Sequence, residues 1–191
     1  ARDIRLDFFR GIAMFIILFA HTPGNWFTSW IPARWGFSDA TEMFVFCSGM
    51  ASAIAFGLTF DRAGLLLGSA RVVYRIWQVY WAHVGLFFAT VALVVWFTDL
   101  GINSKNYWGE LNLWMLFVDG RHWENPNILL SFMTLQWVPN LFDILPMYMV
   151  ILAMMPVVML LQRVHFGLVV LASLTLWVFA QRGLTEALGL P

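Results

Sequence analysis

The sequence has few charged residues: aspartate, glutamate, lysine and arginine together make up 12% of its 191 positions. A soluble domain carries about a quarter of such residues. Hydrophobic residues make up 61%, and they occur in blocks rather than in alternation. Apolar stretches of about 18 or more residues with few charges are typical of membrane helices. The composition therefore predicts an all-α, polytopic integral membrane helix bundle.

Other absences exclude further classes of protein. The eleven basic residues balance eleven acidic ones and form no cluster, so nothing indicates a nucleic-acid partner. Cys47 is the single cysteine and lies in an apolar run, which excludes an internal disulfide. No small-residue cleavage pattern follows the first apolar run, so the N-terminal segment is not a convincing signal peptide. The sequence contains no internal repeat and no low-complexity tract.

Apolar segments predict about five transmembrane helices in a single membrane domain covering residues 1–191. They lie at about residues 6–22, 39–60, 71–97, 141–161 and 166–179. The segment at residues 98–140 is too long for a simple connection. Its apolar parts, "LNLWMLFV" and "NILLSFMTLQW", are too short to span a bilayer, so we expect them to lie at the interface or to re-enter.

The distribution of lysine and arginine predicts the orientation. With a cytoplasmic N-terminus, seven basic residues lie on the cytoplasmic side and four on the opposite side. Cytoplasmic loops of membrane proteins carry the excess of such residues. We therefore expect a cytoplasmic N-terminus, which places segment 98–140 on the outer side.

Two histidines lie inside apolar segments, where an ionisable side chain is costly and commonly marks a pathway or relay. The helix rise of ~1.5 Å per residue puts His21 about 16 Å beyond Arg10, near the middle of a hydrocarbon core of ~30 Å. The same reasoning puts His83 about 12 Å beyond Arg75. A neutral imidazole is an available base near neutral pH. His21 is thus a candidate base, whereas a hydrogen bond to a neighbouring helix would also explain His83.

Carboxylates are expected nearer the outside. Asp39 and Glu42 are three residues apart at the outer end of the second span and share a helix face. They are candidates for orienting His21 or binding substrate hydroxyls, and helix capping explains them equally well. Asp143 opens the fourth span at the same end.

Two arginines mark the inner end of the third span. Arg71 and Arg75 are four residues apart on one helix face. Guanidinium groups suit phosphates, although inner-surface anchoring explains both residues as well. No third ligand at matching depth accompanies the two histidines, so no metal site is predicted.

Four motifs, in order, resemble the OpgC family of bacterial inner-membrane proteins, within the wider membrane acyltransferase 3 superfamily. They are "RLDFFRGIAMFIILFAH" (5–21), "GFSDATEMFVFCSGMASAIAFG" (36–57), "ARVVYRIWQVYWAH" (70–83) and "FDILPMYMVILAMMP" (142–156). The resemblance implies a multi-pass succinyltransferase in contact with membrane lipid. Its donor substrate would be a cytoplasmic acyl-CoA, succinyl-CoA, and its acceptor a hydroxyl of an osmoregulated periplasmic glucan. No permanently bound cofactor is implied.

The resemblance also assigns residues. His21 matches the superfamily's first-helix histidine, which is proposed to activate the acceptor hydroxyl. Arg71 and Arg75 take the place of its paired arginines, with three intervening residues here instead of the usual two. We expect Arg75→Ala to raise the donor KM more than it affects glucan binding. The predicted catalytic residues are His21, Asp39 and Glu42, and the predicted substrate-binding residues are Arg71, Arg75, His83 and Asp143.

Family members are nearly twice as long, so the resemblance covers their N-terminal half. An incomplete bundle would expose a polar face to lipid, which is costly. We therefore expect the rest of the domain, or other membrane subunits, to cover that face. The alternative function is a catalytically inactive relative acting as a structural subunit of a larger membrane complex. A third possibility is a transporter. The lack of paired spans broken by glycine or proline argues against it.

Overall fold

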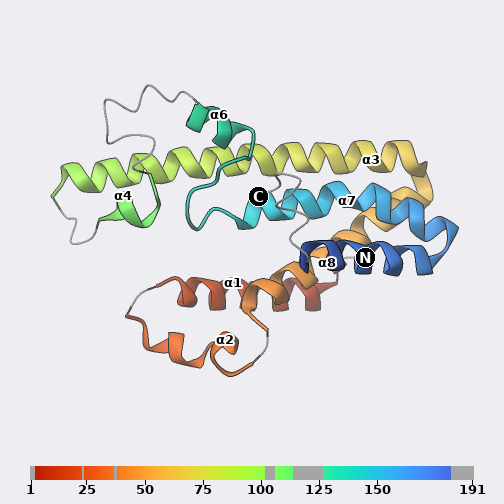
Figure 1. Ribbon diagram of the computed structural model, residues 1–191, viewed down its shortest axis with the longest axis horizontal. Helices are drawn as coiled ribbons and strands as arrows, with labels where there is room; N and C mark the ends of the chain where they lie inside the picture. The colour runs from red at the N-terminus through yellow and green to blue at the C-terminus, as the bar shows by residue number, and fades with distance from the viewer. Residues whose placement is uncertain (1–2, 23, 37, 102–105, 114–126, 182–191) are drawn as a thin grey trace. The chain divides into compact units, whose positions relative to one another are not determined.

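The chain is helical in the part that the structure describes. The computed structural model describes residues 3–22, 24–36, 38–101, 106–113 and 127–181, and no strand occurs among them. The elements are α1 (Ile4–Ala20), η1 (Trp26–Trp30), α2 (Pro32–Trp35), α3 (Ala40–Asp99), α4 (Tyr107–Glu110), α6 (Asn127–Met133), α7 (Ile144–Val164) and α8 (Phe166–Gln181) (Figure 1). For these residues the all-α prediction is confirmed. The chain divides into two compact units, Ala1–Val72 and Val73–Pro191.

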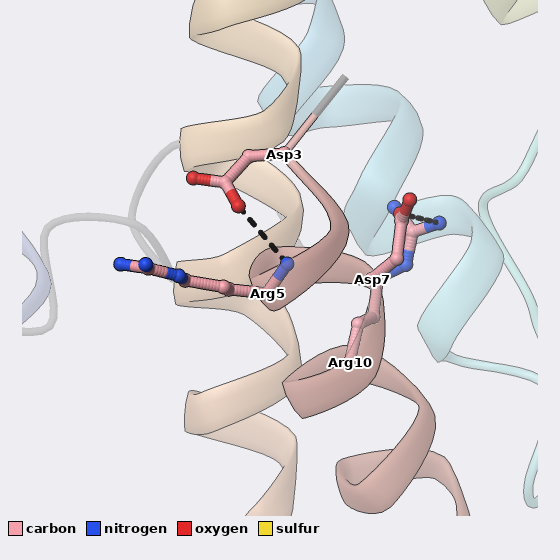
Figure 2. A network of polar contacts seen from close by, with 4 residues as sticks. All are labelled: Asp3, Arg5, Asp7 and Arg10. Carbon is pink, nitrogen blue, oxygen red and sulfur yellow. Dashed lines mark hydrogen bonds and ion pairs between the residues drawn. The ribbon is translucent and has the colours of Figure 1, made fainter.

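Helix α1 begins with charged residues that stabilise its first turns. The Asp3 carboxylate Oδ1 accepts a hydrogen bond from the backbone N–H of Arg5 at 2.9 Å, and Arg10 lies 3.4 Å from Asp7 (Figure 2). A carboxylate in this position satisfies one of the otherwise unpaired N–H groups at a helix start. Helix α1 ends at Ala20, so it lies two residues nearer the N-terminus than the predicted span 6–22.

Helix α3 turns at Gly64. That residue has φ 79° and ψ 177°, a conformation that essentially only glycine adopts. The two limbs, residues 40–63 and 65–99, are helical on either side of the turn (Figure 1). The predicted spans 39–60 and 71–97 therefore belong to one element. The predicted second span ends at residue 60, before Asp61 and Arg62. The first limb continues through these two exposed residues and ends about three residues later, at the turn.

The turn brings the second limb back to the first. Arg71 donates a hydrogen bond from Nη1 to the Thr59 hydroxyl Oγ1 at 3.0 Å. A straight helix would hold these residues about 18 Å apart, so this bond exists only because of the turn. Phe60, with 0% exposure, lies under Gly68. A Cβ atom at Gly68 would come within 2.5 Å of the Phe60 ring.

The second unit contains a core cluster of buried apolar residues. Its buried members come from α3, the turn after α4, α6 and the segment before α7: Val84, Phe87, Leu113, Phe132 and Phe142. Helix α8 packs against α7 and has no buried residue. The predicted span 141–161 corresponds to α7, which begins and ends three residues later, and the span 166–179 corresponds to α8, which ends two residues later.

Two described helices, α3 and α7, are long and apolar enough to cross a membrane. Helix α8 is apolar but has 16 residues. Of the two short segments expected at the interface, "NILLSFMTLQW" contains α6, whereas "LNLWMLFV" falls mostly outside the described residues. The structure thus supplies helices of the expected kind, and the five-span topology stays a prediction.

Gly68→Ala should destabilise the fold. The added methyl group meets the buried Phe60 ring, and overpacking of this kind typically lowers the free energy of unfolding by about 1–3 kcal/mol. The measurement is thermal unfolding of the detergent-solubilised protein. Gly49→Ala is the matched control, because Gly49 lies in the same helix and a Cβ atom there would have nothing within 4 Å. Equal melting temperatures for the two variants would contradict the packing described.

Candidate functional site

A cavity of about 350 Å³ lies in the first unit, next to the turn of α3. This volume is in the range of sites that bind small molecules. Its apolar wall comes from α1 and the first limb of α3: Leu6, Ala51, Ile54, Ala55 and Leu58. Asp3, Asp7 and Arg71 supply its polar groups. The cavity therefore combines an apolar surface with charged side chains.

The charged side chains of this cavity already make some bonds to other residues of the protein. Asp7 pairs with Arg10, and Asp3 accepts the N–H of Arg5 (Figure 2). The Arg71 guanidinium carries five N–H donors, of which the bond to Thr59 uses one. Arg71 is consequently the cavity residue best suited to bind an anionic group.

Arg75 does not share this cavity. Its Nη1 donates to Oε1 of Gln78 at 3.2 Å on the same helix, and the residue belongs to the second unit. The structure thus brings one of the two predicted arginines, Arg71, to a cavity.

The predicted catalytic residues are all exposed. His21 follows the last residue of α1, and its backbone N–H donates to the carbonyl oxygen of Ile17 at 3.1 Å. Asp39 lies at the start of α3, where its Oδ1 accepts the N–H of Ala40 at 2.6 Å. Glu42 is in the first turn of the same helix.

The Asp39 side chain therefore bonds the start of α3, which agrees with the capping explanation given above for this residue. Within the described ranges, no hydrogen bond joins the His21 side chain to Asp39 or Glu42. No three His, Cys, Asp or Glu side chains among the described residues lie close enough together to hold a metal ion.

His83 is the one predicted site residue that is fully buried, with 0% exposure. Its ring stacks on Phe132 at a centroid distance of 5.1 Å and meets the edge of Phe142 at 6.2 Å. Neither ring nitrogen has a hydrogen-bond partner among the described residues. The hydrogen bond to a neighbouring helix that would explain His83 is thus not found among the described residues, where aromatic rings lie against the imidazole. A buried polar group left without a partner costs about 1–3 kcal/mol.

Polar groups of the aromatic residues that pack against this cluster make hydrogen bonds within the protein. The Tyr80 hydroxyl donates to the carbonyl oxygen of Met133 at 2.9 Å, and the Trp108 indole Nε1 donates to the Thr98 hydroxyl at 3.3 Å. Asp143 directly follows Phe142, is exposed, and makes no side-chain capping bond to α7. The structure thus brings two predicted substrate-binding residues, His83 and Asp143, to one region of the second unit.

Among the described residues around the cluster, three non-glycine residues have positive φ: Asn112 (57°), Leu135 (60°) and Leu141 (72°). Asn112 and Leu141 directly precede Leu113 and Phe142 of the cluster. Asn112 and Leu135 lie just after α4 and α6 in the left-handed conformation common at helix C-termini, where the Leu113 and Gln136 N–H groups donate to the carbonyl oxygens of Trp108 and Ser131, both at 2.8 Å. Sequence reasoning missed these residues, since nothing in a leucine-rich segment marks a left-handed position.

These observations define an all-helical protein with helices long and apolar enough for a membrane and with two polar regions set among apolar side chains. The chain belongs to the OpgC protein family, whose sequence pattern matches residues 2–188.

One curated protein is also similar over a shorter stretch. It is eukaryotic translation initiation factor 2A of Dictyostelium discoideum, which is 35% identical over 93 residues, covering 42% of this chain and 15% of that protein. The chain thus spans a small part of that protein's length. No solved structure matches the chain.

His83→Leu should leave the protein at least as stable as the native form. The substitution removes two ring nitrogens that lack partners and keeps an apolar side chain of similar volume, so the free energy of unfolding should rise by up to about 1–3 kcal/mol. His83→Ala leaves a cavity in the same place and should lower it by a comparable amount or more. Thermal unfolding in detergent measures both. A His83→Leu variant that melts well below the native protein would show that the imidazole nitrogens have a stabilising partner.

Proposed function

We propose that the protein is a membrane O-acyltransferase that moves a succinyl group from a cytoplasmic acyl-CoA to a hydroxyl of a periplasmic glucan. The observation that carries this proposal is the match to the OpgC family over residues 2–188. In this proposal the chain is a multi-pass protein of the bacterial inner membrane, with a cytoplasmic N-terminus and about five spans.

The transfer forms one ester and breaks one thioester. The hydroxyl oxygen of the glucan attacks the thioester carbonyl carbon, the bond from that carbon to sulfur breaks, and coenzyme A leaves as the thiolate. His21 takes the proton of the attacking hydroxyl and returns it to the thiolate. Asp39 and Glu42 are then positioned to orient His21 or to bind sugar hydroxyls once substrate draws these exposed side chains together.

The cavity beside Gly64 is the proposed donor site. Arg71 offers N–H donors to the phosphates of the acyl-CoA, while the apolar wall suits the less polar arm that carries the acyl group. The N-terminal end of α1 contributes Asp3 and Asp7 to this cavity, so a cytoplasmic N-terminus places it on the donor's side of the membrane.

Arg71→Ala should raise the KM for succinyl-CoA by about 10–100-fold, because a hydrogen bond to a charged group contributes about 1.5–3 kcal/mol. The KM for glucan should change little. Steady-state transfer of labelled succinyl in proteoliposomes measures both constants. Arg75→Ala is the matched control: it removes the same side chain one turn along α3, where the guanidinium bonds Gln78, and should affect the donor KM less. An effect of Arg75→Ala equal to or larger than that of Arg71→Ala would contradict the placement of the donor.

His21→Ala should lower the transfer rate by about 10²–10⁴-fold, the usual contribution of a general base. The comparison requires native and variant protein inserted at equal levels and melting at the same temperature. His165→Ala is the control, because His165 is likewise an exposed histidine that follows the last residue of a helix.

Undiminished transfer by His21→Ala would overturn the assignment of the base. Absence of transfer by the native protein would favour the alternative, a structural subunit of a larger membrane complex.

A further inference from the structure

We propose that the aromatic cluster around His83 binds a glucose unit of the acceptor glucan, with the imidazole bonding sugar hydroxyls. This inference rests on the proposed function and adds a glucan-binding subsite in the second unit, separate from the residues proposed to act on the acceptor hydroxyl. The cluster consists of Val84, Phe87, Leu113, Phe132 and Phe142, with Tyr80, Trp108 and Trp137 packed against it.

The first argument is the unmet hydrogen bonding of His83. The ring is fully buried, and both nitrogens lack a partner among the described residues. A neutral imidazole has one N–H donor and one acceptor nitrogen. Neighbouring hydroxyls of a sugar satisfy both, because each hydroxyl donates and accepts. An acyl chain of a lipid would satisfy neither nitrogen.

The second argument is the chemistry of the surroundings. Tyr80, Trp108 and Trp137 are only partly buried against the cluster, and broad aromatic faces pack well against the C–H faces of a sugar ring. The exposed Asp143, next to Phe142, supplies a carboxylate that accepts hydrogen bonds from sugar hydroxyls. The combination of aromatic faces, one imidazole and one carboxylate therefore favours a neutral, hydroxyl-rich ligand.

A sugar ring reaches His83 only when the rings that cover it move. Phe132 and Phe142 lie directly against the imidazole, and Phe132 is in the last turn of α6. Leu135 follows that helix with the positive φ common at helix C-termini, where the Gln136 N–H donates to the Ser131 carbonyl oxygen at 2.8 Å. In this proposal the sugar ring takes the place of Phe132 against the imidazole.

The test is equilibrium binding of a soluble β-glucan oligosaccharide to the purified, detergent-solubilised chain, measured by isothermal titration calorimetry without any acyl donor. His83→Leu should weaken binding by about tenfold or more, which corresponds to the loss of one or two hydrogen bonds. His83→Gln, whose side chain also donates and accepts, should retain more affinity than His83→Leu. Thr90→Val is the control, because its hydroxyl bonds the Leu86 carbonyl oxygen on the same helix and Thr90 is not one of the residues of the cluster.

The outcomes separate this inference from the proposed function. Binding by the native protein and its loss in His83→Leu support the site even if no succinyl transfer is detected. Equal binding by native and His83→Leu proteins of equal stability overturns it, whether or not transfer occurs. A native protein that transfers succinyl but binds no glucan without donor also overturns it as stated.

Discussion

The turn of α3 at Gly64 is the constraint on which the first unit depends. A continuous helix would carry Arg71 far from Thr59, whereas the turn joins the two by a hydrogen bond of 3.0 Å. The cavity beside it draws its walls from both limbs and from the start of α1. Close approach of Phe60 to Gly68 then fixes the two limbs against each other. The proposed donor site thus follows from one backbone conformation that only glycine supplies readily.

In the second unit, the stabilising burial of aromatic rings is opposed by the cost of burying a polar imidazole. His83 sits among aromatic rings that stabilise the fold through their burial, yet the imidazole itself is without partners among the described residues there. Buried polar groups without a partner are rare in native proteins and call for an explanation such as a functional role. The two units therefore differ: the first has a cavity with charged side chains, and the second has a buried imidazole without a hydrogen-bond partner among the described residues.

Hydrophobic patterning was enough to predict the all-α class and the approximate bounds of α1, α7 and α8, because each is an apolar run that begins or ends at polar residues. It predicted a break between the second and third spans, at residues 61–70, but not the position of the turn, since Asp61 and Arg62 resemble a helix end and Gly64 looks like any other glycine. Nor could it predict the surroundings of His83, because Phe132 and Phe142 lie some fifty residues or more further along the chain. Contacts at that separation depend on tertiary packing, which a periodic pattern on one segment does not encode.

The second limb of α3, residues 65–99, is about 52 Å long at the usual helix rise. A bilayer has a hydrocarbon core of ~30 Å, and membrane helices tilt by up to about 40°. Even at that tilt the limb covers roughly 40 Å along the membrane normal, so in a membrane about 10 Å of it must project beyond the hydrocarbon. How much of the limb lies outside the hydrocarbon core therefore depends on the thickness of the bilayer and on the tilt of the helix.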